Sequence, residues 1–301
     1  MTPIPEPGEP IIEVRDLKKV FGNQVVLDGL NLDILRGETL VVMGGSGCGK
    51  STFLRMLIGS IPPTEGTITM LGRRIDEIDE AALNEVRQHF GILFQSGALF
   101  QSMTLAQNVA LPLEEHTDLD PTIIDIQVKI KLELVGLREH AEKLPAQISG
   151  GMKKRAGLAR ALALDPLILF YDEPSAGLDP VTSAEIDQLI VDLTKKLGVT
   201  SIVVTHEMDS AFTIADRMVM LDKGRVLQIG TRDEFDDIRN LADDQIDELS
   251  QDARLIRQFL RGDPVGPITK RREETNYAED LLKTADPMIT RSPAVQATRP
   301  R

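Results

Sequence analysis

A glycine-rich loop with a single lysine lies between the apolar run Thr39–Met43 and a helix-like segment. The loop consists of Gly44, Gly45, Ser46, Gly47, Cys48, Gly49, Lys50, Ser51 and Thr52. Glycines let backbone N–H groups point at phosphate oxygens, and a helix N-terminus adds partial positive charge. Lys50 would supply a point charge, and Ser51 would place its hydroxyl on a phosphate-bridging Mg²⁺. The pattern predicts a phosphate-binding turn, the alternative being a flexible glycine-rich turn.

Two adjacent carboxylates follow a second apolar run, Leu167–Tyr171, which is typical of a buried parallel strand. We expect Asp172 to hold the Mg²⁺ shell through water. Glu173 would polarise an attacking water as general base, a role worth about 10² to 10⁴ in rate. A helix N-cap carboxylate before Pro174 is the alternative interpretation.

A second anion-binding turn consists of Ser149, Gly150 and Gly151, which precede a helical segment. Free N–H groups at a helix start suit an anion. Taken alone, Ser-Gly-Gly is also compatible with an ordinary N-cap. Two phosphate-binding turns in one chain indicate that nucleotide is shared with a neighbouring chain.

With these motifs in view, the chain resembles the ATP-binding cassette (ABC) family of transport ATPases from about Ile11 to Gly230. The resemblance implies an ATPase with an α/β P-loop core, a small antiparallel β subdomain and an inserted helical subdomain. It implies a homodimer that binds ATP and Mg²⁺, in which Ser149–Gly151 of one subunit cap the γ-phosphate held by the other. Integral membrane permease subunits are the implied partners.

Further positions resemble family positions with known roles. Gln95 resembles the glutamine that contacts Mg²⁺ and the attacking water, and Asp179 resembles the aspartate that contacts the partner's P-loop. His206 resembles the switch histidine at the γ-phosphate, although a lone histidine after a strand is also typical of a surface residue. Phe21 stands where the family places a ring on adenine, and a core role is the alternative.

Residues beside the Ser-Gly-Gly turn narrow the resemblance. Ile148 and Met152 stand where the family more often has Leu and then Gln or Glu, which puts in doubt any signalling contact made by a polar side chain at Met152. Met152 followed by basic residues resembles the ATPases of bacterial envelope lipid transporters that work with Mce-domain proteins. Four further segments share that resemblance: Leu93–Phe100, Asn108–Thr117, Leu132–Leu137 and Gln258–Ile268. It implies phospholipid or related lipid as cargo, an Mce-domain partner and a small regulatory subunit.

Composition is ordinary for a globular protein, with 42% hydrophobic and 27% charged residues in 301. The net charge of -13 argues against a nucleic-acid surface. No apolar run reaches the roughly 18 residues of a membrane span, and residues 1–10 do not resemble a signal peptide. We therefore expect a cytoplasmic protein that binds peripherally at the inner membrane through its partners. Cys48, the only cysteine, lies beside a helix start that favours a thiolate, so fast, ATP-sensitive alkylation is one expectation; a tolerated small side chain is the other.

Periodicity predicts the organisation of the chain. Inner parallel strands are expected at 91–94, 167–171 and 201–205, and an antiparallel sheet carrying Phe21 at 11–20 and 66–71. Helical patterns mark a subdomain over about 96–164, clearest at 126–137 and 149–164, and a hairpin turns at Lys223-Gly224.

The expected domains are a flexible N-terminus (1–10), the ATPase domain (11–232), an acidic and amphipathic segment (233–262) and a disordered tail (263–301). Two other functions remain open. One is the ATPase of an amino-acid or other small-solute importer, and the other is a soluble ABC ATPase acting outside transport.

Overall fold

The computed structural model describes residues 4–242, 245 and 249–269. The chain divides into two units, Met1–Asp237 and Ile238–Arg301. The strands are β1 (Pro10–Phe21), β2 (Gln24–Leu35), β3 (Thr39–Gly44), β4 (Glu65–Met70), β5 (Arg73–Arg74), β6 (Phe90–Leu93), β7 (Ile168–Asp172), β8 (Thr200–Val204), β9 (Arg217–Asp222) and β10 (Arg225–Thr231). The helices are α1 (Lys50–Leu57), α2 (Glu80–Arg87), α3 (Leu105–His116), α4 (Pro121–Leu134), α5 (Gly150–Ala161), α6 (Pro180–Leu197), α7 (Met208–Ile214), α8 (Arg232–Asn240) and α9 (Gln251–Arg261), with short 3-10 turns at Arg138–His140 and Pro145–Gln147.

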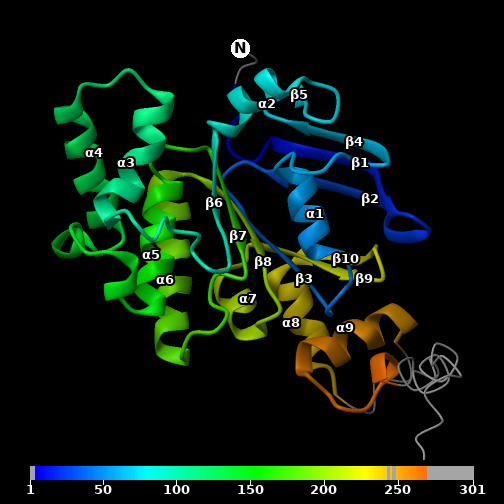
Figure 1. The fold of residues 1–301 in the computed structure, drawn as a ribbon. Helices are drawn as coiled ribbons and strands as arrows, with labels where there is room; N and C mark the ends of the chain where they lie inside the picture. Colours follow the sequence, from blue (N-terminus) through cyan, green and yellow to red (C-terminus); the bar gives the residue numbers. More distant parts are fainter. Residues whose placement is uncertain (1–3, 243–244, 246–248, 270–301) are drawn as a thin grey trace, which may run out of the picture. The chain divides into compact units, whose positions relative to one another are not determined.

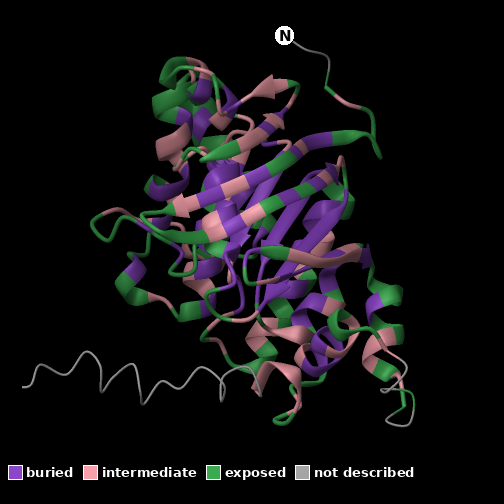
Figure 2. Cartoon of the chain, turned by 90° about the vertical axis from the view of Figure 1, so that its right-hand side faces the viewer, coloured by how far each residue is buried: buried purple, intermediate pink, exposed green. Residues whose placement is uncertain are grey.

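The larger sheet has six strands in the order β10-β9-β3-β8-β7-β6 (Figure 1). Its neighbours pair in parallel except for the antiparallel hairpin β9–β10. Strands β3 and β8 are buried along their whole length, as expected of apolar strands covered on both faces (Figure 2). Val204 pairs with both Val42 and Asp172, so three carboxyl ends meet at one edge. The predicted α/β core is confirmed.

The smaller sheet is antiparallel, in the order β2-β1-β4-β5. Buried and exposed residues mix along β1 and β2, because only one face of this sheet covers the core. Phe21 ends β1, so the expected sheet does carry this ring. Strand β2 was not predicted from the sequence, although its length matches that of β1.

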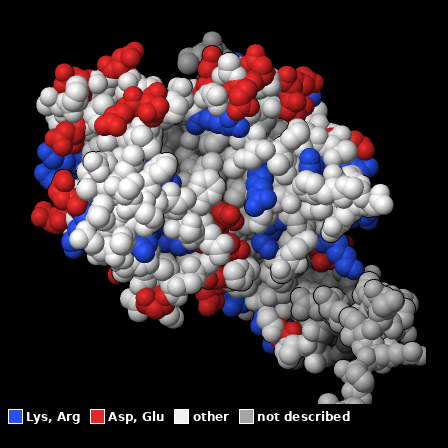
Figure 3. Space-filling model, in the orientation of Figure 1, with Lys and Arg blue, Asp and Glu red and all other residues white. Residues whose placement is uncertain are grey.

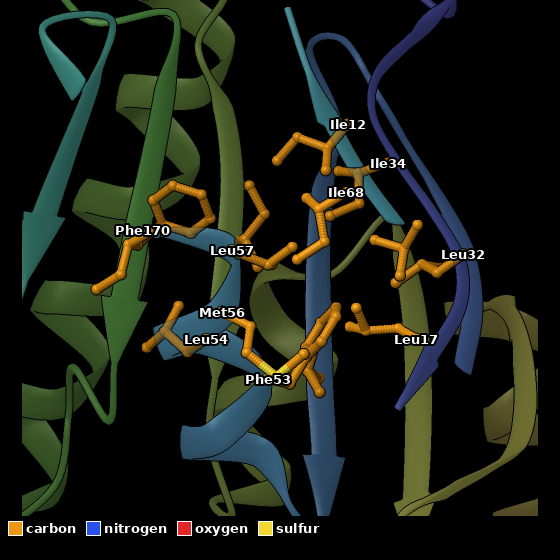
Figure 4. Close-up of a cluster of buried hydrophobic side chains, with 14 of the residues drawn as sticks. Ile12, Leu17, Leu32, Ile34, Phe53, Leu54, Met56, Leu57, Ile68 and Phe170 are labelled. Atoms are coloured by element: carbon orange, nitrogen blue, oxygen red, sulfur yellow. The ribbon is translucent and has the colours of Figure 1, made fainter. Parts of the chain in front are cut away.

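Helix α1 is packed between the two sheets. Figure 4 shows its apolar side chains between β7 on one side and the antiparallel strands on the other; those labelled are Phe53, Leu54, Met56 and Leu57 of α1, Phe170 of β7, and Ile12, Leu17, Leu32, Ile34 and Ile68 of the small sheet. Phe53 is 1% exposed and Leu57 is fully buried. This core therefore fixes the position of Lys50, the first residue of α1.

A helical insertion lies between β6 and β7, as predicted, and its helices α3, α4 and α5 pack on one another (Figure 1). A capping box formed by Thr104 and Gln107 starts α3. Asn108 is fully buried, and its amide bonds both the N–H and the C=O of Phe100 and the carbonyls of Met103 and Thr104. Asn108 thus holds the segment that leads from Gln95 into the insertion.

The second unit contains α9, which begins at the Ser250 N-cap and ends at Gly262 in the left-handed conformation. Its residues Leu255, Ile256 and Leu260 are buried. The Gln258 amide bonds the backbone of Asp263 and Ile268, so the chain as far as Thr269 folds back on α9. Residues 270–301 of the tail that we expected to be disordered, and residues 243–244 and 246–248 of the acidic segment, lie outside the described residues.

Surface charge on the face drawn in Figure 3 is mixed, with lysines and arginines scattered and acidic side chains gathered along the upper edge. None of the helices among the described residues combines the length and hydropathy that a membrane span requires.

Because Phe53 fills the space between the sheets, we expect Phe53→Ala to lower the free energy of unfolding by about 3–5 kcal/mol. Val25→Ala is the matched control: its side chain is 50% exposed, so the change should stay within about 0.5 kcal/mol. Urea unfolding followed by circular dichroism measures both. Equal midpoints for the two variants would contradict the packing described above.

Candidate functional site

The phosphate-binding loop joins the carboxyl end of β3 to α1, as the sequence predicts. Lys50 is buried, and its Nζ donates to the carbonyl oxygens of Gly44 at 2.7 Å and Gly45 at 3.1 Å. Ser46 and Gly47 are exposed, as is Ser51 in the first turn of α1. The loop therefore combines a lysine with a helix start that no side chain caps, and a polyphosphate needs both features.

Gly49 shows why the loop has glycine at the helix start. It caps α1 with φ +111°, and a Cβ there would lie 2.7 Å from Leu27 Cδ2 and 3.0 Å from the Val26 carbonyl oxygen. The turn of the β9–β10 hairpin braces the same place, because Gly224 donates to the Cys48 carbonyl at 3.0 Å and accepts from the Asp28 amide at 2.9 Å. These two hydrogen bonds, here called the brace at Gly224, tie the loop to both sheets and were not predicted from the sequence.

The environment of Cys48 differs from the one that we expected for a reactive thiol. Its side chain is 5% exposed, and burial raises the pKa of the thiol, with Lys50 acting in the opposite direction. The helix start that favours a thiolate is thus outweighed by desolvation. Burial of the thiol contradicts the fast alkylation that we expected, and the alternative of a tolerated small side chain fits the structure.

The acidic pair lies beside this loop, at the carboxyl end of β7. Asp172 ends the strand; burial and the charge of Glu173 raise the pKa of its carboxyl, and Arg55, Lys154 and Lys50 oppose that shift. Glu173 adopts φ +50°, a region uncommon for a residue with a side chain. This turn points its side chain away from the direction that a continued strand would give.

His206 contacts Glu173 through both its ring and its backbone. His206 Nδ1 lies 2.8 Å from Glu173 Oε1, and the His206 amide donates to Oε2 at 3.3 Å. The pair results from strand order, because β8 lies next to β7 and His206 follows the end of β8. The glutamate is mostly buried and the imidazole is exposed, so the histidine forms the outer face of the pair.

Lys154 is a site residue that the sequence analysis missed. It is 4% exposed on α5, and its Nζ donates to the Glu173 carbonyl oxygen at 2.8 Å. In the sequence it belongs to a basic run that is typical of a solvated helix face. The available signal was its spacing, since Lys154 lies three residues after Gly151 and three before Gly157, both of which are buried in the same helix.

The Ser-Gly-Gly turn starts α5. Ser149 is the N-cap and accepts a hydrogen bond from Met152 N at 3.3 Å, so it has the geometry of an ordinary cap. Gly151 allows α5 to approach α6, because a Cβ there would lie 2.4 Å from Thr182 Cγ2. Ser149 and Gly150 are exposed, and Met152 is half-buried. The first two residues of this turn are therefore accessible to an anion, whereas the Met152 N–H is already bonded to Ser149.

The remaining predicted residues lie around these motifs. Gln95 is exposed in the turn after β6. Asp179 caps α6, and hydrogen bonds from Thr182 lower the pKa of its carboxyl. Phe21 is 49% exposed, and Lys19 Nζ lies 5.0 Å from its ring centroid. A core role for Phe21 does not fit this exposure, and one lysine already lies over its ring.

A magnesium ion would find only part of its coordination shell in the chain. Among the described residues, no group of three or more His, Cys, Asp or Glu side chains could hold a metal ion. The half-buried Asp172 carboxyl and the exposed Ser51 hydroxyl are oxygen donors of the kind that Mg²⁺ prefers. Mg²⁺ commonly takes one or two protein ligands and completes its shell with phosphates and water, so these residues fit the ion.

The structure thus brings together the loop, the acidic pair and His206 within one chain. In the described residues, the polar contacts of Ser149 and Asp179 go to the starts of their own helices. Ser149, Gly150 and Asp179, which are predicted to act across a subunit boundary, are exposed, and their polar contacts are separate from those of the loop.

Burial of Cys48 predicts that iodoacetamide labels the folded protein at least about tenfold more slowly than the unfolded chain, since only an accessible thiolate reacts. Mass spectrometry of samples quenched at pH 8, with and without denaturant, measures the two rates. Equal rates would show that the thiol is accessible in the native state.

Comparisons with known proteins bear on the family of the chain. A family model described as ABC transporter matches residues 27–176. The chain is 44% identical over 271 residues to the "Probable ribonucleotide transport ATP-binding protein mkl" of Mycobacterium leprae, covering 89% of this chain and 74% of that protein. It is 39% identical over 272 residues to the "Intermembrane phospholipid transport system ATP-binding protein MlaF" of Escherichia coli K12, covering 90% of this chain and 96% of that protein.

Solved structures give the same result. An ATP-binding cassette dimer in a post-hydrolysis state with ADP and Pi superposes with a TM-score of 0.68 at 30% identity, covering 73% of this chain and 98% of that one. The cbiO1 protein of Clostridium perfringens, part of a transporter complex, superposes with a TM-score of 0.71 at 32% identity, covering 75% and 90%. The chain therefore belongs to the ABC transporter family, as an ATP-hydrolysing, ATP-binding subunit.

Proposed function

We propose that this chain forms a homodimer that closes around two Mg·ATP molecules and thereby drives the membrane permease of a lipid transporter. The observation that carries the nucleotide part is the Lys50 loop beside the Glu173–His206 pair, with a second, outward-facing anion turn at Ser149. A solved relative that is an ATP-binding cassette dimer with ADP and Pi supports the dimeric arrangement.

The phosphates, the adenine and the Mg²⁺ of the nucleotide would each be bound by different residues. Backbone N–H groups of residues 44–49 and the ammonium of Lys50 would hold the phosphates, with Lys50 exchanging its present carbonyl partners for phosphate oxygens. The exposed face of Phe21 would stack on adenine. Ser51, Asp172 and Gln95 would hold Mg²⁺, which neutralises charge on the phosphates during transfer.

Hydrolysis would use Glu173 as the general base. Its carboxylate is held on both oxygens by His206, at 2.8 Å and 3.3 Å, so its orientation toward a water is limited to a narrow range. With Nδ1 engaged by Glu173, His206 would use Nε2 toward the γ-phosphate. Gln95, which is exposed after β6, would position the attacking water. It would also transmit the change from bound ATP to bound product to the helical insertion.

Closure would be completed by the partner. The start of α5, where Ser149 and Gly150 are exposed and Gly151 and Met152 follow, would cap the γ-phosphate bound to the other subunit's loop. Asp179, which caps α6, would contact the partner's loop. Hydrolysis would then reopen the dimer, and both movements would reach the permease through α3, α4 and α5.

Phospholipid or a related lipid is the cargo that we propose. Met152 after the Ser-Gly-Gly turn supports it, and so does the alignment with a phospholipid transport ATP-binding protein over 96% of that protein's length. The mkl relative, whose name refers to ribonucleotide transport, has higher identity but is covered over 74% of its length. We place the chain on the cytoplasmic side of the inner membrane, with a permease, an Mce-domain protein and a small regulatory subunit as partners.

Replacing the base should trap the closed state. We expect Glu173→Gln to reduce ATP turnover by about 10²- to 10⁴-fold, because proton abstraction is lost while binding is kept. Light scattering after size exclusion with Mg·ATP should then give the mass of a dimer. Glu85→Gln, on the exposed side of α2, is the control and should behave as wild type. A Glu173→Gln protein that stays monomeric at saturating ATP would rule out the shared site.

Affinity capture from gently solubilised native membranes tests the cargo. We expect a permease, an Mce-domain protein and bound phospholipid to copurify with the tagged chain, and an untagged strain serves as the control. Capture of a nucleotide or amino-acid permease instead would overturn the lipid assignment and leave the catalytic roles in place.

A further inference from the structure

The general base Glu173 has an unusual backbone. Its φ of +50° lies in the left-handed region, which residues with a Cβ adopt only when their surroundings hold them there. On one side the Glu173 amide donates to the Val204 carbonyl oxygen at 2.9 Å. On the other side the Glu173 carbonyl accepts from the Ala176 amide at 3.3 Å and from Lys154 Nζ at 2.8 Å. The shortest of these bonds comes from Lys154.

The placement of Lys154 is costly, which indicates a specific role. Its side chain is 4% exposed, and burial lowers the pKa of the amine while the charges of Glu173, Asp172 and Glu207 oppose that shift. Buried ammonium groups are rare unless paired. Lys154 therefore supplies a hydrogen-bond donor at the acidic pair without reaching the solvent.

Helix α5 connects this contact to the Ser-Gly-Gly turn. Ser149 caps the helix and Lys154 lies on its second turn, so the two residues are about 7 Å apart along the helix axis. Gly151 fixes this part of α5 against α6 at Thr182, and Arg155 pairs with Glu185 of α6. A shift at the start of α5 must therefore also displace Lys154.

We infer that Lys154 is a positioning residue, which holds the peptide of the general base to the helix whose start caps the partner's nucleotide. In a closed dimer each Lys154 would then link the two nucleotide sites, since it contacts the base of one site and lies on the helix that completes the other. The first part of this proposal, that Lys154 positions Glu173, requires only that the protein hydrolyses ATP. The second part, the link between the two sites, also rests on the proposed dimer.

Lys154→Met in the full-length protein tests the hold on Glu173, because methionine keeps most of the side-chain volume and removes the donor. We expect kcat for ATP hydrolysis to fall about 10- to 100-fold while KM for ATP stays unchanged, since small misplacement of a base slows chemistry without altering phosphate binding. Lys154→Arg keeps a charged donor and should recover part of the rate.

Lys153→Met is the matched control. Lys153 is the neighbouring residue on α5, half-buried, with no ion pair of its ammonium in the described part of the chain. It should keep the wild-type kcat. The proposal would be overturned if Lys154→Met had the same kcat as Lys153→Met. It would also be overturned if Lys154→Arg were as slow as Lys154→Met.

Two further measurements separate this proposal from the dimer itself. The double variant Lys154→Met, Glu173→Gln should still form the ATP-bound dimer, and a monomer here beside dimeric Glu173→Gln would show that Lys154 acts in closure instead. The Hill coefficient for ATP should exceed one in wild type and fall toward one in Lys154→Met. An equal coefficient in both proteins would overturn the link between sites.

Discussion

The burial of α1 between two sheets is the interaction on which the site depends. Phe53 and Leu57 are buried almost completely, so the helix cannot shift without opening the core on both of its sides. Lys50 and Ser51 are the first residues of that helix. The hydrophobic effect, which is non-directional, here fixes the position of a cation and a hydroxyl that we propose bind the phosphates and Mg²⁺ of the nucleotide. The start of α1 is thus anchored by apolar side-chain packing, while hydrogen bonds hold the loop before it to the β9–β10 turn.

Strand order supplies the second part of the arrangement. Because β3, β8 and β7 are parallel neighbours, the residues after their carboxyl ends converge on one edge. The phosphate loop, the acidic pair and His206 come from distant parts of the sequence, yet each needs only to follow its own strand. The exposed residues at the starts of α5 and α6 are not part of this convergence, and we propose that they act on the nucleotide of a partner subunit.

Much of this could be predicted from the sequence, for reasons visible in particular residues. Continuous apolar runs such as that before Asp172 mark buried parallel strands, and a glycine loop before a helix marks a phosphate turn. The sequence could not reveal the burial of Cys48, because solvent access depends on neighbours that pack from elsewhere in the chain. For Lys154 the only signal was its spacing between two glycines of the same helix. Helix α5 shows the limit well: its basic run contains one buried lysine beside one half-buried lysine.

The brace at Gly224 has a mechanical consequence. The phosphate loop is bonded to the turn of the β9–β10 hairpin, that turn is bonded to β2, and α1 continues into the core. A loop held by this turn and by α1 has little freedom to change its backbone around a ligand, so we expect the Lys50 side chain to exchange partners and little ordering entropy to be lost when nucleotide binds. We therefore expect the movements of turnover to occur between rigid bodies, while the backbone of the loop keeps its conformation.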